Sequence, residues 1–226
     1  MARERYQRQL DGLRSDVLDL ATRVIERLED AVDALETGNE ALAREVIEGD
    51  AVINNRYLEL EKACIDLLAL QQPVAGDLRF ITASFKIITD LERISDLAVN
   101  LGQYTLEGEA SVFEDIELRH LGESARDLVV DAMDAYERHD AAACFDIAAR
   151  DDDLDRACKD ATDAVIRELL ASRIDEEGSR AELERFMTDV SNLLLTIRDL
   201  ERVGDHGVNI AARTLYMVEH DDSLIY

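Results

Sequence analysis

The chain has 226 residues, of which 51 are acidic and 25 are lysine or arginine, giving a formal net charge of −26. This charge repels nucleic-acid phosphates and anionic lipid headgroups, which argues against direct binding to nucleic acid or to a lipid surface. The N-terminal segment lacks the apolar core of a signal peptide. The sequence contains no run of about 18 uncharged apolar residues, the length needed to cross a membrane, so we expect a cytoplasmic protein.

Composition predicts an all-α fold. Apolar residues make up 47% of the chain, and Ala, Leu, Glu, Asp and Arg, which suit helices, dominate it. The chain has one proline, Pro73, no tryptophan, and no run of alternating β-branched and polar residues typical of a strand. Because Cys64, Cys144 and Cys158 are widely spaced and outside any C-x-x-C pair, we expect buried thiols in a reducing compartment.

Apolar periodicity and helix-breaking residues predict helices connected by short turns, an arrangement that favours antiparallel neighbours. Ser111 with Glu114, and Ser179 with Glu182, resemble capping boxes that would open the fourth and the last of these helices. The six predicted helices cover approximately residues 6–36, 40–70, 77–106, 111–139, 141–171 and 179–219.

The sequence also repeats itself. DAVDALE at 30–36 matches DAMDAYE at 131–137, a shift of 101 residues, and DLERISDLAVNL at 90–101 matches DLERVGDHGVNI at 199–210, a shift of 109. About eight additional residues in the loop near 172–179 would account for the difference between the two shifts. Two matched blocks in the same order indicate an internal duplication. We therefore predict two tandem three-helix bundles, with domains at residues 1–109 and 110–226.

Each copy of the second block carries an acidic motif on one face of its helix. Residues spaced by four align along a helix, and stepping by seven gives an apolar stripe that only a glutamate interrupts. A carboxylate on a packed face needs an arginine or a metal ion as its counter-charge, and the spacing leaves both alternatives open. The candidate metal ligands are Glu92, Asp96 and Asn100 in the first copy and Glu201, Asp205 and Asn209 in the second.

A second set of acidic positions lies on the preceding helices. Asp50 and Asn54 correspond to Asp151 and Asp155, again four residues apart. They would complete a site opposite the motif helices, although a solvated acidic face is an equal alternative. All-oxygen ligands favour hard cations such as Mg, Ca, Mn or ferric iron. His206 would extend the choice to zinc, but a packing or capping role explains this residue better.

The segments TDLERISDLAVNLG and RDLERVGDHGVNIAAR resemble the repeated signature of the PhoU family of phosphate-uptake regulators, in which Glu or Asp is followed four residues later by Asp. The resemblance covers the whole chain. It implies two three-helix bundles, a homodimer, and multinuclear iron or zinc clusters on the acidic faces of the motif helices. One difference between the copies is Leu97, where the second copy has His206, so the two sites need not be equal.

The same resemblance implies an adaptor rather than an enzyme. Such a protein would dock on the ATPase subunit of a phosphate ABC transporter, reduce uptake when phosphate is plentiful, and in many bacteria connect the transporter with a sensor histidine kinase.

Two other classes of protein remain as alternatives. A carboxylate-bridged di-iron oxidase in a helical bundle would need two Glu-x-x-His motifs, and the chain supplies one, from Glu117 to His120. The other alternative is a metal-free helical scaffold whose acids are salt-bridged. Hydrolase and nucleotide-binding motifs such as G-x-S-x-G and the P-loop are missing.

The charge composition also favours adaptation to salt. The chain has only three lysines, Lys62, Lys86 and Lys159, beside its large acidic excess. In a salt-rich, halophilic cytoplasm, screening would remove most of the self-repulsion, and dilution of salt would unfold the protein. The alternative is an ordinary acidic protein that its charge keeps soluble.

Overall fold

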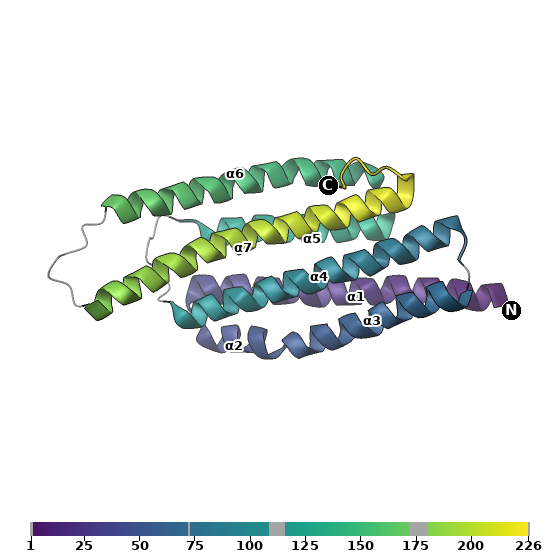
Figure 1. The fold of residues 1–226 in the computed structure, drawn as a ribbon, viewed down its shortest axis with the longest axis horizontal. Helices are drawn as coiled ribbons and strands as arrows, with labels where there is room; N and C mark the ends of the chain where they lie inside the picture. Colours follow the sequence, from purple (N-terminus) through teal and green to yellow (C-terminus); the bar gives the residue numbers. More distant parts are fainter. Residues whose placement is uncertain (1, 72, 109–115, 172–179, 226) are drawn as a thin grey trace.

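The computed structural model describes residues 2–71, 73–108, 116–171 and 180–225, and every regular element in these ranges is an α-helix (Figure 1). This confirms the all-α prediction. No helix in these ranges is both long enough and apolar enough to cross a membrane. The helices are α1 (Ala2–Thr37), α2 (Glu40–Glu48), α3 (Asp50–Gln71), α4 (Ala75–Glu107), α5 (Leu118–Arg138), α6 (Ala141–Ala171) and α7 (Arg180–Glu219).

Local chemistry sets several helix ends where the sequence predicts them. Gly38 follows α1 with a φ of 62°, a left-handed conformation that glycine adopts freely. Asn39 then caps α2, because its side-chain oxygen accepts a hydrogen bond from the N–H of Leu42 at 3.2 Å. His139 ends α5 in the same left-handed region, with a φ of 56°.

The segment predicted as one helix over 40–70 is two helices, so the prediction was wrong at this point. Gly49 separates α2 from α3, and its N–H bonds to the carbonyl of Glu45. The guanidinium of Arg27, from α1, donates a hydrogen bond to the carbonyl of Val46. A side chain at position 49 would overlap this guanidinium. A contact from another helix therefore breaks a segment whose own periodicity is continuous.

The fourth helix also differs from the prediction. α5 begins at Leu118, and residues 116–117 before it are not helical. Ser111, Glu114 and Ser179, on which the predicted capping boxes depend, lie outside the described residues.

The helices form two groups that pack side by side. α1, α2, α3 and α4 contact one another, as do α5, α6 and α7. Between the groups, α4 lies against α7 and α1 lies against α5, while α3 and α6 run along opposite edges of the molecule (Figure 1). Buried residues of both groups belong to one hydrophobic core, including Leu28, Leu91, Leu128 and Leu200. The two repeats therefore share a core.

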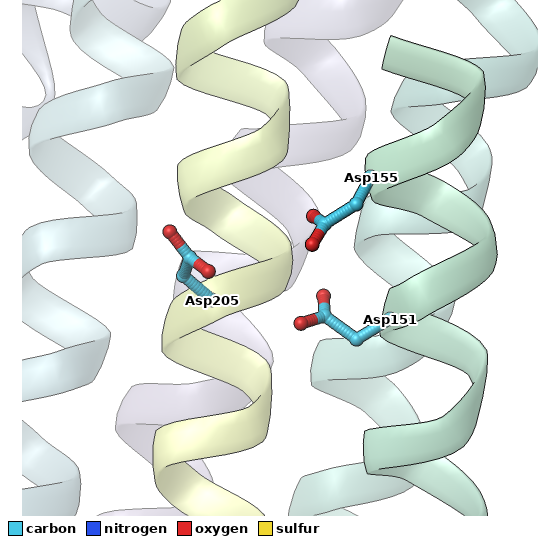
Figure 2. Close-up of side chains that lie close together, drawn as sticks. All are labelled: Asp151, Asp155 and Asp205. Carbon is cyan, nitrogen blue, oxygen red and sulfur yellow. The ribbon is translucent and has the colours of Figure 1, made fainter. Parts of the chain in front are cut away.

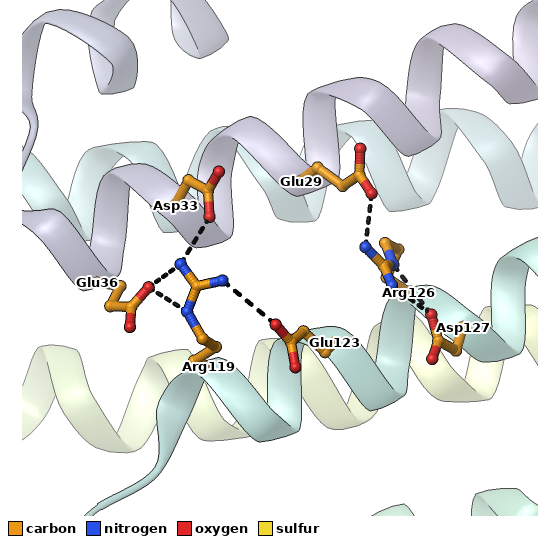
Figure 3. Close-up of polar contacts among 7 residues, drawn as sticks. All are labelled: Glu29, Asp33, Glu36, Arg119, Glu123, Arg126 and Asp127. Atoms are coloured by element: carbon orange, nitrogen blue, oxygen red, sulfur yellow. Dashed lines mark hydrogen bonds and ion pairs between the residues drawn. The ribbon is translucent and has the colours of Figure 1, made fainter.

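Surface ion pairs join the repeats where α1 meets α5. Arg119 on α5 pairs with Asp33 at 3.0 Å and with Glu36 on α1, and Arg126 Nη1 lies 2.6 Å from an oxygen of Glu29 (Figure 3). The acidic partners are about half exposed, so each pair contributes little to stability in water.

Candidate metal-binding faces

Two acidic faces form where each motif helix meets the helix that precedes it. We call them the first face, between α3 and α4, and the second face, between α6 and α7. Hydrogen bonds on the first face, and electrostatic coupling and short oxygen–oxygen distances on the second, show that the members of each face lie close together. The first face consists of Asp50, Asn54, Glu92 and Asp96, and the second of Asp151, Asp155, Glu201 and Asp205.

The second face gathers carboxylates around a common point. Asp151 and Asp155 project from α6 toward Asp205 on α7 (Figure 2). One oxygen of each lies within 4.8 Å of the others, a spacing at which three oxygens can coordinate one cation. Oxygen Oδ1 of Asp151 is buried and has no hydrogen-bond partner among the described residues. An unpaired buried carboxylate oxygen is costly, and a cation would remove that cost.

The electrostatics of the second face point in the same direction. Burial, followed by repulsion from Asp155 and Asp205, raises the pKa of Asp151 from 3.8 to about 7. Burial also raises the pKa of Glu201 and of Asp155, and Asp205 adds to both shifts. No ion pair to an arginine offsets this repulsion at the second-face carboxylates among the described residues. These residues therefore have the charge and the oxygen donors to hold a hard cation.

The backbone of α7 leaves room beside Asp151. Gly204 is buried, and a Cβ at this position would lie 2.7 Å from Asp151 Oδ1 and 2.6 Å from Leu154 Cδ2. At Gly207 a Cβ would lie 3.3 Å from backbone and side-chain atoms of Leu128, so this glycine allows α7 to approach α5. The mid-helix glycines serve close packing, and Gly204 also shapes the second face.

The first face is organised differently, because hydrogen-bond donors surround its central carboxylate. Asp50 accepts a hydrogen bond from the hydroxyl of Ser95 at 3.2 Å and one from the Asn54 amide at 2.6 Å. Burial raises the pKa of Glu92 and of Asp96, and neighbouring carboxylates add to each shift.

An arginine also adjoins the first face. Arg93 Nε lies 3.7 Å from Glu92 Oε2, and its positive charge lowers the pKa of Glu92 and Asp96, partly opposing the effect of burial. Glu92 is 22% exposed. The stripe that contains Glu92 therefore lies at the edge of the buried face of α4. Leu91 and Ile94 fill the core instead.

The two asparagines of the motif lie in different surroundings. Asn100 donates its amide N–H to Asp199 Oδ2 at 3.1 Å, across the contact between α4 and α7. Asn209 is exposed on α7. The amide of Asn100 is thus engaged in joining the two repeats.

Two carboxylates that sequence reasoning did not single out form polar contacts between α4 and α7, across the two repeats. Asp199 is fully buried and accepts hydrogen bonds from Asn100 and from Tyr104 Oη, the latter at 2.9 Å. Its equivalent, Asp90, lies 2.9 Å from Nδ1 of His206. This contact gives His206 the packing role favoured from sequence. The available signal was that Asp90 and Asp199 each begin the repeated block.

The single Glu-x-x-His segment forms no inward-facing site. Glu117 precedes α5 and is not helical, and His120 is exposed on the first turn. The two residues therefore do not line the interior of the bundle, as ligands of a di-iron centre would.

Comparison with known proteins relates both repeats to one family. A family model described as the PhoU domain matches residues 17–105 and again residues 118–214. A "Phosphate-specific transport system accessory protein PhoU homolog" of Pseudomonas putida is 34% identical over 223 residues, covering 97% of this chain and 82% of that protein. A homologue with the same description, numbered 1, from Thermotoga maritima is 35% identical over 215 residues, covering 94% and 88%. The crystal structure of PhoU from Pseudomonas aeruginosa superposes with a TM-score of 0.85 at 33% identity, covering 96% of this chain and 100% of that one.

Proposed function

The chain belongs to the PhoU family, and we propose that it regulates phosphate uptake as a non-enzymatic adaptor of a phosphate ABC transporter. The observation that carries this proposal is the double match to the PhoU domain, which includes both motif helices and both acidic faces. Relatives named as accessory proteins of the phosphate-specific transport system match the chain over nearly its whole length. Such an adaptor would act in the cytoplasm and reduce uptake when phosphate is plentiful.

The partner surface follows from charge. A chain with a net charge of −26 is attracted to a surface rich in Arg or Lys, because complementary charge steers association and disfavours wrong partners. The ATPase subunit of the transporter is the partner we propose for this contact, and a sensor histidine kinase is the second. We further propose that the functional form is a homodimer.

Metal ions form the remaining part of the proposal. Iron or zinc is the family expectation, and Mn, Mg and Ca also suit oxygen ligands. A bound cation would neutralise the repulsion among the carboxylates. Around it, Asp151 and Asp205 would contribute oxygens from two helices and so hold α6 against α7.

Deletion of the gene tests the regulatory role. We expect the deletion strain to accumulate more phosphate under replete conditions and to alter phosphate-responsive expression, and expression of the full chain from a plasmid should restore both. Radiolabelled phosphate uptake and a reporter of phosphate-starvation genes provide the measurements. Unchanged uptake and unchanged reporter activity in the deletion strain would refute the proposal.

A binding experiment tests the partner. The purified transporter ATPase should bind the full-length chain with an affinity that falls as salt is raised, because exposed charges are screened. Binding that is insensitive to salt would contradict the electrostatic argument, and an absence of binding at low salt would exclude this subunit as the direct partner.

A further inference from the structure

The two acidic faces occupy equivalent positions in the duplication but differ at two residues beside the central carboxylate. Asn54 on the first face corresponds to Asp155 on the second, and Ser95 corresponds to Gly204. Both differences remove a hydrogen-bond donor from the second face. An ionised aspartate cannot donate, and glycine has no side chain. The central carboxylates themselves, Asp50 and Asp151, are the same residue type.

On the first face the two donors satisfy both oxygens of the central carboxylate. Ser95 donates to Oδ1 of Asp50, and Asn54 donates to Oδ2. Ser95 is fully buried, so its hydroxyl is held at this position by packing. A cation approaching Asp50 would compete with these hydrogen bonds, and any bond that it displaced would leave a donor without its partner.

On the second face neither donor is available. The ionised carboxylate of Asp155 repels Asp151, and Gly204 has no side chain to offer. Oxygen Oδ1 of Asp151, which corresponds to the oxygen that Ser95 satisfies on the first face, is buried without a hydrogen-bond partner among the described residues. Neutral donors thus satisfy the central carboxylate in the first repeat, whereas the corresponding oxygen in the second repeat has no such donor.

The arginines of the two motifs add a third difference. Arg93 lies 3.7 Å from Glu92 and so places a positive charge beside the first face. The equivalent Arg202 lies 3.6 Å from the buried Asp199, which belongs to the contact between the repeats. A cation would be repelled by Arg93 at the first face, whereas Arg202 is directed away from the second.

We propose that the two repeats have divided roles: the second face holds the metal, and the first face is kept in place by its own hydrogen bonds and Arg93 and binds metal weakly. This inference rests on the metal binding in the proposed function, and it assigns that binding to one repeat. Each molecule would then bind metal at one face only. In the other repeat, Asn54, Ser95 and Arg93 would stabilise the carboxylates instead of a cation.

Matched substitutions in the full-length protein test the assignment. The probe is Mn²⁺, measured by equilibrium dialysis with elemental analysis after removal of metal with a chelator. Asp151→Asn and Asp205→Asn should each weaken Mn²⁺ binding by at least about tenfold, the scale seen when a metal site is disturbed. The equivalent changes in the first face, Asp50→Asn and Asp96→Asn, should leave the affinity within about twofold. Far-UV circular dichroism of each variant checks that it is folded.

A reciprocal exchange guards against general effects on folding. Asp155→Asn gives the second face the amide of the first, and we expect it to reduce Mn²⁺ binding. Asn54→Asp combined with Ser95→Gly gives the first face the pattern of the second, and we expect this double variant to bind additional Mn²⁺. Equal losses from the matched pairs, or loss only from the first-face variants, would overturn the inference.

The failure of this inference differs from failure of the proposed function. A wild-type protein that binds no Mn²⁺ would refute the assignment and remove the metal from the proposed function, while the uptake phenotype of the deletion strain would still test regulation. Two equal Mn²⁺ sites would keep metal binding and refute only the division between the repeats.

Discussion

Replacing Asp199 with alanine removes the acceptor that joins α7 to α4. This carboxylate is 0% exposed and receives hydrogen bonds from Asn100 at 3.1 Å and from Tyr104 at 2.9 Å, both across the contact between the repeats. On its own helix it also accepts from Arg198 Nη2 at 2.7 Å. Alanine would leave the amide and the phenol of α4 without this acceptor.

The expected cost follows from these contacts. A hydrogen bond to a charged group contributes about 1.5–3 kcal/mol, and Asp199 accepts two such bonds from α4. Arg198 is 53% exposed, so water replaces its bond to Asp199 at little cost. We therefore expect Asp199→Ala to lower the free energy of unfolding by about 3–5 kcal/mol, mainly through the two cross-repeat bonds. For a chain of this length this corresponds to a fall in Tm of roughly 6–20 °C.

The equivalent residue of the other repeat provides the control. Asp90 has one partner in this contact, His206, and is 15% exposed, so Asp90→Ala should cost only about 1 kcal/mol. Urea unfolding, followed by far-UV circular dichroism at fixed salt, gives both values. A double-mutant cycle of Asp199→Ala with Tyr104→Phe should show a coupling energy of about 1–3 kcal/mol. Equal losses for the two aspartates, or a coupling energy near zero, would refute the reasoning.

Three further predictions concern salt, pH and packing. Raising KCl should raise the Tm, because screening of the −26 net charge outweighs the weakening of exposed ion pairs, and a Tm that falls with KCl would contradict this. The metal-free protein should lose stability as the pH rises from about 4 to 7. The folded chain keeps a proton on Asp151, whose pKa is about 7, whereas the unfolded chain releases that proton near pH 3.8. The urea midpoint of Asp151→Asn should therefore depend less on pH than that of the unsubstituted protein. Gly122→Ala should cost about 1–3 kcal/mol, since its Cβ would lie 2.7 Å from methyl groups of Val32. By contrast, Gly12→Ala, which meets no atom within 4 Å, should stabilise α1 by roughly 0.5–1 kcal/mol, and thermal unfolding compares the two.

The sequence predicts most helix ends because their causes are local. Gly38 and Asn39 act through backbone conformation and a hydrogen bond three residues away, and both act where periodicity ends. The division between α2 and α3 has a different cause, since Arg27 reaches Val46 from another helix. The periodicity of residues 40–70 does not report on a side chain from α1, and the one local signal of the break was Gly49, which caps α2.

The same distinction applies to the candidate site. Spacing by four places Glu92 with Asp96, and Glu201 with Asp205, on common helix faces, and the structure keeps each pair together with acids of the preceding helix. The partner of Asn100 depends instead on how α4 packs against α7. That packing is long-range, so spacing alone cannot distinguish a side chain on an acidic face from one that joins the two repeats.

The order of residues in the repeated motif ties the acidic faces to the contact between the repeats. Asp90 and Glu92 are two positions apart on α4, as are Asp199 and Glu201 on α7, and two positions correspond to about 200° around a helix. The first acid of each motif therefore meets the other repeat, while the second projects toward the preceding helix. Since α3 and α6 run along opposite edges of the molecule, the two faces are separated by the packed helices α4 and α7 (Figure 1). A cation bound at one face therefore does not share ligands with the other, which is the geometric condition for the two repeats to diverge independently.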